Sequence, residues 1–155
     1  MKTVLVVDAD SGSSSIMEIL QRRGFRGIAA QNARGALAAL RSEPSIALVI
    51  TEMQFSDMDG LHFLIAVRAT SPGVPIIVVT SSGSIESYLH AVNLGVYEYM
   101  NKPVSAKELI RIASLALAGP WTVPSLRDGS CPAGRPTDPV PPVQSGTAAT
   151  SRQQR

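Results

Sequence analysis

The sequence has little cysteine, few aromatic residues and no long apolar run, and each of these shortages excludes a class of protein. Its single cysteine, Cys131, cannot form a disulfide within the chain, so nothing indicates an oxidising compartment. The apolar segment near the N-terminus, residues 3–7, meets Asp8 at once and is too short for a signal peptide or a membrane span. We therefore expect a cytoplasmic protein that makes no use of a membrane.

The chain also lacks a strong charge of either sign. Its formal net charge is +2 over 155 residues, which gives no electrostatic footprint for a nucleic acid. Between residues 1 and 118 the basic and acidic residues balance, and the small surplus comes from four arginines in the remaining segment. We therefore expect no nucleic-acid partner.

Composition changes abruptly at Gly119. Seven of the eleven prolines lie in residues 119–155, mixed with Gly, Ser, Thr and Gln, and no apolar periodicity continues there. Such a segment cannot bury enough apolar surface to offset the entropy of ordering it. We expect a domain over residues 2–118 and a disordered tail over residues 119–155, in which Trp121 and Leu126 could dock locally but cannot form a second core.

Residues 1–118 alternate between short Val/Ile-rich runs and amphipathic stretches. The runs predict buried parallel strands, and the amphipathic stretches predict helices between them. The expected strands are Thr3–Val7, Gly27–Ala30, Ile46–Thr51, Val74–Thr80 and Tyr97–Met100. The expected helices are Ser14–Arg23, Asn32–Arg41, Gly60–Ala69, Ser84–Leu94 and Ala106–Leu117. This alternation predicts an α/β fold with a doubly wound, five-stranded parallel sheet.

Polar side chains follow four of these strands where each one ends. Asp8 and Asp10 follow the first strand, Glu52 follows the third, Thr80 ends the fourth and Lys102 follows the fifth. Open α/β sheets place their functional groups at the carboxyl ends of their strands. We therefore expect carboxylates, a hydroxyl and an ammonium to converge at one edge of the sheet.

The same positions carry a family resemblance. The segments Val4–Asp8, Ser56–Gly60, Thr80 and Tyr99–Pro103 resemble, in order and spacing, a bacterial response-regulator receiver domain of the CheY-like kind. The resemblance covers roughly residues 2–118, and it implies the flavodoxin-like strand order 2-1-3-4-5 and a two-component phosphorelay function. The ordered set is specific, although no single fragment is.

The resemblance also implies a chemistry. In the family, an aspartate after the third strand accepts a phosphoryl group from a histidine kinase, with a magnesium ion held by acidic residues after the first strand. Lys102 and Thr80 match the lysine and hydroxyl that bind the phosphoryl oxygens, and Tyr99 matches the aromatic residue that switches. The family docks partners, and often a second copy, on the face of its fourth helix, fifth strand and fifth helix.

No Ser-His-Asp or Cys-His arrangement is present, so we do not expect an enzyme.

The sequence departs from that pattern around the acceptor. Glu52 stands where the family has aspartate, and its extra methylene moves the carboxylate by about 1 Å, enough to spoil an attacking geometry. Asp8 matches the first acid of the metal pair, but Ala9 replaces the second. Asp10, one residue later, is a candidate for the acidic pocket, although it suits the cap of the following helix better. Any magnesium held by Asp8 and Glu52 should therefore bind weakly.

Two interpretations of Glu52 remain open. Its carboxylate could reach Lys102 and Thr80 and stand in permanently for the phosphorylated aspartate, or the site could have decayed and no longer switch. Asp57 and Asp59 are candidate surrogate acceptors, although both also suit a turn and a helix start.

We predict an atypical single-domain response regulator that is phosphorylation-independent or impaired and acts through contacts with a histidine kinase or another signalling protein. The alternative is a flavodoxin-like small-molecule or nucleotide binder, in which the serines and glycine of residues 11–15 bind a phosphate at a helix N-terminus. Asp8 and Asp10 would repel such an anion, and the chain has few aromatic residues to enclose a flavin.

Overall fold

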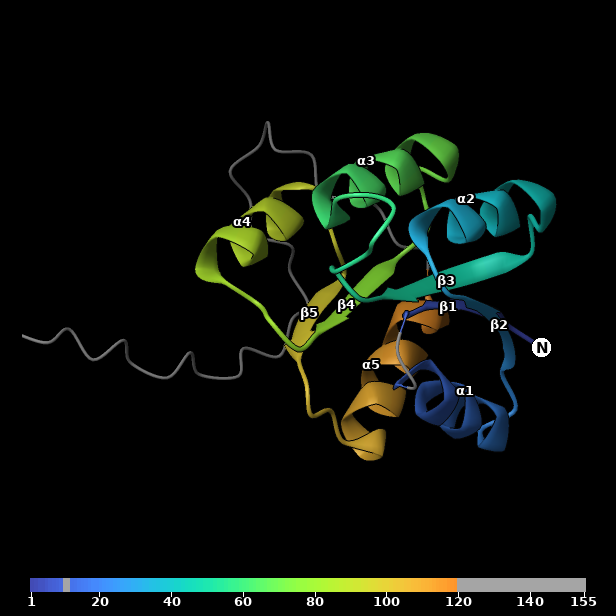
Figure 1. Cartoon of the computed structure of the whole chain (residues 1–155). Coiled ribbons are helices and arrows are strands. Elements are labelled where there is room, and N and C mark those ends of the chain that lie inside the picture. Colours follow the sequence, from blue (N-terminus) through green and yellow to red (C-terminus); the bar gives the residue numbers. More distant parts are fainter. Residues whose placement is uncertain (10–11, 120–155) are drawn as a thin grey trace, which may run out of the picture.

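The computed structural model describes residues 1–9 and 12–119, in which five strands alternate with five helices (Figure 1). The strands are β1 (Thr3–Val7), β2 (Arg26–Ala30), β3 (Ile46–Thr51), β4 (Ile76–Thr80) and β5 (Glu98–Asn101). The helices are α1 (Gly12–Arg22), α2 (Ala33–Ser42), α3 (Gly60–Thr70), α4 (Ile85–Asn93) and α5 (Ala106–Ala118). All strand pairs are parallel, and the order is β2-β1-β3-β4-β5. The predicted fold class and strand order are confirmed.

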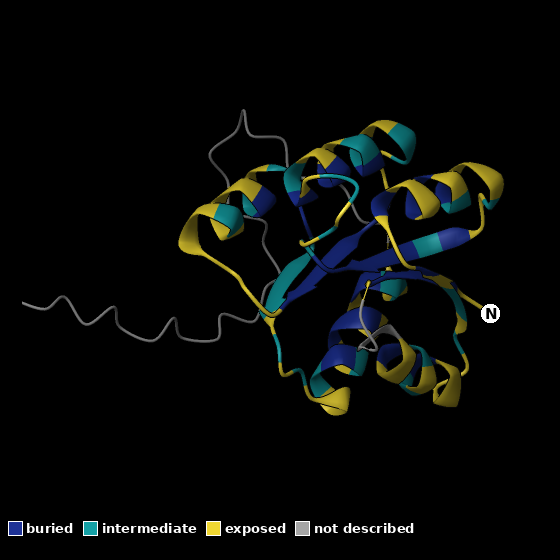
Figure 2. Ribbon diagram, in the orientation of Figure 1, coloured by how far each residue is buried: buried dark blue, intermediate teal, exposed yellow. Residues whose placement is uncertain are grey.

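Helices cover both faces of this sheet. Figure 1 shows α1 and α5 on one face and α2, α3 and α4 on the other. Because side chains alternate along a strand, β1 sends Val4 and Val6 into the core under α1 and α5, and Leu5 and Val7 into the other core. The central strands β1, β3 and β4 are consequently the most buried part of the domain, whereas the edge strands β2 and β5 are partly exposed (Figure 2).

Element boundaries differ slightly from the predicted ones. β4 begins at Ile76 rather than at Val74, because Pro75 has no N–H and contributes only its carbonyl oxygen, which accepts from Val49 at 3.0 Å. α1 begins at Gly12, two residues before the predicted start. The proposed tail, with Trp121, Leu126 and Cys131, lies outside the described residues apart from Gly119, and so does Asp10.

Arg68 ties α3 to the end of α4. Its guanidinium donates from Nε to the Leu94 carbonyl at 3.1 Å and from Nη2 to the Gly95 carbonyl at 2.7 Å, and Nη1 reaches the Val74 carbonyl. Arg68 lies next to the buried residues of α3, which include Leu64 and Val67, and its hydrogen bonds explain why a cation is tolerated there. Its donors satisfy carbonyls that α4 and the following turn leave without a helical partner.

Candidate functional site

Four residues converge at the carboxyl edge of the sheet, as its strand order requires. Asp8 follows β1, Glu52 follows β3, Thr80 ends β4, and Lys102 lies just beyond β5. Backbone hydrogen bonds continue past the strands and position three of them: Asp8 N–H donates to Ala30, Glu52 N–H to Val7, and Lys102 N–H to Thr80, at 2.8–3.1 Å. The peptide bond between Lys102 and Pro103 is cis. Asp8, Glu52 and Thr80 are buried.

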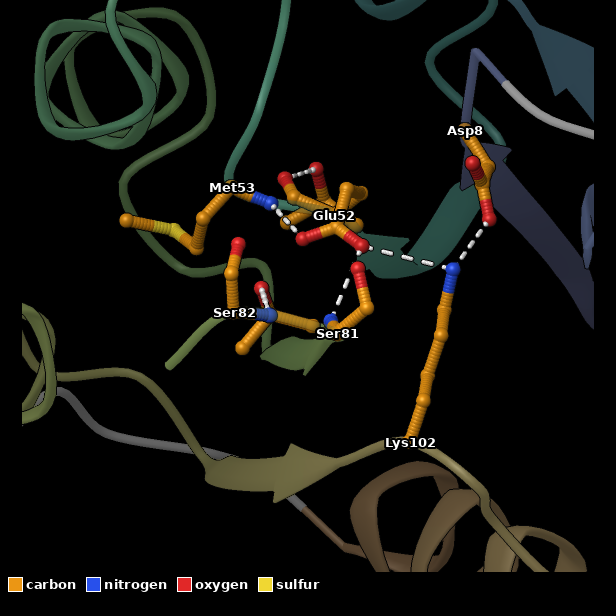
Figure 3. A network of polar contacts seen from close by, with 8 residues as sticks. Asp8, Glu52, Met53, Ser81, Ser82 and Lys102 are labelled. Atoms are coloured by element: carbon orange, nitrogen blue, oxygen red, sulfur yellow. Dashed lines mark hydrogen bonds and ion pairs between the residues drawn. The ribbon is translucent and has the colours of Figure 1, made fainter. Parts of the chain in front are cut away.

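The Lys102 ammonium joins two carboxylates. Its Nζ lies 2.9 Å from Asp8 Oδ2 and 3.3 Å from Glu52 Oε2 (Figure 3). Burial alone would lower the pKa of Lys102, but its contacts with Asp8 and then Glu52 outweigh burial, and the net pKa is raised. The lysine therefore stays charged, and it reduces the negative charge of the site to about that of one carboxylate.

Both oxygens of the Glu52 carboxylate are engaged. Oε1 accepts the backbone N–H of Met53 at 2.7 Å, and Oε2 accepts that of Ser81 at 3.3 Å in addition to its ion pair with Lys102 (Figure 3). Only 7% of Glu52 is exposed to solvent. Two backbone N–H groups and an ammonium thus surround the carboxylate, which is the kind of donor set that stabilises an oxyanion.

Thr80 does not supply the contact that the sequence suggested. Its hydroxyl is fully buried and accepts the backbone N–H of Ser82 at 3.3 Å, within its own turn. Among the described residues, the donor to Glu52 on this side of the site is the backbone N–H of Ser81, the residue that follows Thr80 at the end of β4. Every residue type except proline carries a backbone N–H, so the side-chain pattern gave no signal for this donor.

Tyr99 of β5 faces α4. Its hydroxyl lies 2.9 Å from Ser87 Oγ, and its ring meets Tyr88 edge-on with centroids 5.5 Å apart. The loop after β4 packs closely on it, since a Cβ atom at Gly83 would lie 2.8 Å from the Tyr99 hydroxyl. Tyr99 thus links β5 to α4, while Lys102, on the same segment, links it to Glu52.

Asp57 and Asp59 each accept backbone N–H groups at the N-terminus of a helix. Asp57 accepts the N–H groups of Ala33 and Arg34, at 3.2 and 3.0 Å, and so caps α2 from a loop far away in sequence. The hydrogen bond from Arg34 is the main reason that the pKa of Asp57 is lowered. Asp59 caps its own helix, α3. These contacts favour structural roles for both carboxylates over surrogate phosphorylation.

The loop that carries Asp57 and Asp59 is tightly packed. A Cβ atom placed at Gly60 would lie 2.2 Å from the Met53 carbonyl oxygen, so only glycine fits at the start of α3 without moving the backbone. Met53 is the residue whose N–H binds Glu52. The packing at Gly60 therefore helps to hold one of the donors of the site in place.

The described residues offer few side-chain ligands to a divalent cation. Within residues 1–9 and 12–119, the carboxylates at this edge are those of Asp8 and Glu52, and the Lys102 ammonium lies within 3.3 Å of both. Ala9 adds no side-chain oxygen, and no group of three or more acidic, His or Cys side chains is found in the part of the chain that the structure describes. Magnesium would therefore share both carboxylates with the Lys102 ammonium and take its remaining oxygen ligands from elsewhere.

The sheet order, the acidic edge and the lysine beyond β5 define a receiver-type signalling domain. The family model for the response regulator receiver domain matches residues 4–114, and the chain belongs to this family. The family assignment made from the sequence is thus confirmed. Receiver domains are modules of two-component signalling systems rather than typical enzymes, and this assignment favours the receiver over the flavodoxin-like alternative.

Two curated relatives illustrate the match. The nitrogen assimilation regulatory protein NtrX from Azorhizobium caulinodans is 31% identical over 116 residues, covering 74% of this chain and 26% of the relative. The transcriptional regulatory protein ZraR from Salmonella typhimurium is 32% identical over 116 residues, with the same two shares. The chain therefore spans about a quarter of the length of these relatives.

Among solved structures, a CheY-like response regulator receiver domain protein from Methanospirillum hungatei superposes with a TM-score of 0.73 at 28% identity. The match covers 76% of this chain and 94% of that one. A receiver protein from Pseudomonas putida has a TM-score of 0.70 at 28% identity, covering 73% and 95%. Within residues 1–9 and 12–119, no helix is both long and apolar enough to span a membrane.

Proposed function

We propose that this receiver is impaired in phosphorylation and signals through protein–protein contacts, with Glu52 occupying the place of the phosphoryl group. One observation carries the proposal: the Glu52 carboxylate is bound by Lys102 and by the N–H groups of Met53 and Ser81. In the family, the lysine after the fifth strand binds the oxygens of the transferred phosphoryl group, and backbone N–H groups are donors that suit the same kind of oxyanion. Here a side chain of the protein itself uses them.

Phosphoryl transfer to Glu52 should be slow for a geometric and an electrostatic reason. An attacking carboxylate needs a free oxygen in line with phosphorus, and both oxygens of Glu52 are engaged and almost buried. Its charge is partly neutralised by Lys102, which lowers its nucleophilicity. Because Ala9 removes one carboxylate ligand and Lys102 already pairs with Asp8 and Glu52, we also propose that the domain binds magnesium weakly or not at all.

We propose that the partner is a histidine kinase or another signalling protein, and that the domain works in the cytoplasm. For residues 1–119 we propose neither a nucleic-acid partner nor a membrane partner. The face built from α4, β5 and α5 supports protein docking, because α4 exposes 80% of Ile85, 54% of Leu89 and 41% of Tyr88. Tyr99 lies directly behind this face and contacts Tyr88. The same face could serve a second copy of the chain.

The proposal is tested by backbone NMR with magnesium and beryllium fluoride, an analogue of the phosphoryl group. We expect no saturable shifts at Thr80 and Tyr99 in the wild-type chain. The double variant Glu52→Asp with Ala9→Asp restores both family residues and should respond, whereas Ala9→Asp alone, which keeps Glu52, should not. Large wild-type shifts at Thr80 and Tyr99 would overturn the proposal.

The same spectra distinguish a permanently activated site from a decayed one. If Glu52 stands in for the phosphorylated aspartate, the wild-type signals near Tyr99 should resemble those of the double variant bound to beryllium fluoride. Glu52→Gln should then move them towards the unliganded double variant. If wild type and Glu52→Gln coincide at Tyr99, the site has decayed and Glu52 has no signalling role.

A further inference from the structure

Helix α4 is attached to the domain by very little buried surface (Figure 2). Among its nine residues, all of which the structure describes, only Ala91 is buried, whereas α2, α3 and α5 bury four residues each. The first half of α4, residues 85–89, contains no buried residue. A short helix with so few buried apolar contacts gains little from core packing, so polar contacts must contribute much of what keeps it in place.

Polar contacts are present at both ends of α4. Beyond its C-terminal end, Arg68 donates to the carbonyls of Leu94 and Gly95. At its N-terminal end, Ser84 and Ser87 form a capping box, in which the N–H of each serine donates to the hydroxyl of the other at 3.1 Å. The capping box stabilises the first turn of the helix, but both of its members belong to that turn. It therefore does not attach α4 to the sheet.

The attachment to the sheet comes from Tyr99 of β5, whose hydroxyl lies 2.9 Å from Ser87 Oγ. A serine hydroxyl has one proton and two lone pairs. The Ser87 proton has the Ser84 carbonyl oxygen as its acceptor at 3.0 Å, and one lone pair accepts the Ser84 N–H. The second lone pair faces the Tyr99 hydroxyl and, farther away at 3.2 Å, Ser84 Oγ. The shorter contact favours the phenol as the donor to Ser87.

Neighbouring groups hold the Tyr99 side chain in this position. The Tyr88 ring meets the Tyr99 ring edge-on. On the loop before α4, a Cβ atom at Gly83 would lie 2.8 Å from the Tyr99 hydroxyl and 2.5 Å from Asn101 Oδ1, so the absence of a side chain lets this loop approach β5 closely. The phenol is therefore confined beside the capping box of α4.

We propose that the hydrogen bond from Tyr99 to Ser87 keeps residues 85–89 of α4 folded against the sheet, with Ser87 as the positioning residue. When this bond breaks, the first turn of α4 opens while Arg68 still holds the region beyond its other end. Opening moves the exposed side chains of Ile85 and Tyr88 and so changes the apolar surface that α4 presents. The proposal does not depend on the function proposed for Glu52.

Amide hydrogen exchange in the full-length chain, measured residue by residue by NMR and corrected for intrinsic rates, tests the proposal. Tyr99→Phe removes the phenolic hydroxyl and keeps the ring. We expect the amides of residues 87–89 to exchange roughly two- to tenfold faster, as the loss of one neutral hydrogen bond implies, while the amides of α5 keep their wild-type rates. The matched control is Tyr88→Phe, which removes the same group from the neighbouring ring, 41% exposed, and should leave both sets of rates unchanged.

A second background identifies the partner of the Tyr99 hydroxyl. Ser87→Ala removes the acceptor, so adding Tyr99→Phe to it should accelerate exchange in residues 87–89 no further. Equal acceleration by Tyr99→Phe with and without Ser87 would assign the hydroxyl to another partner and overturn the proposal. Wild-type rates in Tyr99→Phe, or the same acceleration in Tyr88→Phe, would also overturn it. Acceleration that extends equally to α5 would show a global loss of stability instead of local opening, and would overturn it as well.

Discussion

Glu52→Gln separates the charge of Glu52 from its shape. The amide has nearly the size of the carboxylate, so the packing between β3 and β4 should survive. Glu52 now accepts one N–H group on each carboxylate oxygen, from Met53 and from Ser81. The glutamine oxygen can replace only one of these acceptors, and the glutamine NH₂ group, itself a donor, must then face the other N–H. The ion pair of Lys102 with this position is lost, although Lys102 keeps Asp8 at 2.9 Å.

The expected loss of stability follows from these contacts. Hydrogen bonds to charged groups contribute about 1.5–3 kcal/mol each, and removing the partner of a buried ion costs about 3–5 kcal/mol when the ion is left alone. Lys102 is not left alone, and its side chain is 25% exposed, so solvent screens part of the effect. We therefore expect the free energy of unfolding to fall by about 1.5–3 kcal/mol.

Urea denaturation followed by far-UV circular dichroism measures this change as a lower midpoint with an unchanged slope. The matched control is Glu86→Gln, the same substitution on a side chain that is 86% exposed, and it should change stability little. Equal midpoints for the two variants at pH 7 would refute the network described around Glu52.

Alkaline pH supplies a second test of the same variant. The pKa of Lys102 is raised in the folded state, so its ion pairs stabilise the fold fully below the unfolded pKa of about 10.4 and lose this effect as pH rises through the folded pKa. The gap between wild type and Glu52→Gln should therefore narrow above about pH 10.4. A gap that stays constant through the alkaline range would show that the charge of Lys102 is not involved.

Three further substitutions test the supporting structure. Gly60→Ala should destabilise by about 1–3 kcal/mol, measured by urea denaturation, because its Cβ would lie 2.2 Å from the Met53 carbonyl oxygen; an unchanged midpoint would contradict this packing. Arg68→Met should cost about 1–3 kcal/mol in the same assay, since partly buried carbonyls near the end of α4 lose their donor. A neutral result would mean that water replaces the guanidinium. Asp57→Asn should speed amide hydrogen exchange in the first turn of α2 at neutral pH. Because the pKa of Asp57 is lowered in the folded state, its stabilisation is present above the unfolded pKa and lost as pH falls through the folded one, so wild type and variant should converge in acid.

Much of the fold could be predicted from the local sequence pattern. The Val/Ile runs predicted β1 and β3 with the residue bounds that the structure shows, because strands buried on both faces need continuous apolar sequence. β4 was predicted two residues too long, since Val74 continues the apolar run although Pro75 interrupts the hydrogen bonding. Apolarity locates a strand, but its ends depend on backbone donors.

The site was less predictable for a related reason. Side-chain type identified Asp8, Glu52 and Lys102 as residues at strand ends, and the structure brings them together. The N–H of Ser81 was not predicted, because every residue type except proline has a backbone N–H and residue type therefore does not show which one donates to the site. The cap that Asp57 provides for α2 was missed because its partners lie more than twenty residues earlier, beyond the range of any local rule.

The contact between Lys102 and Asp8 also bears on how the domain folds. The two residues are separated by 94 positions, so their pairing closes nearly the whole length of the domain and requires β1, β3, β4 and β5 to be aligned first. An interaction of this kind is expected to form after the folding transition state. Weakening it should then raise the unfolding rate and leave the folding rate almost unchanged, so Lys102 would govern how long the native domain persists rather than how fast it forms.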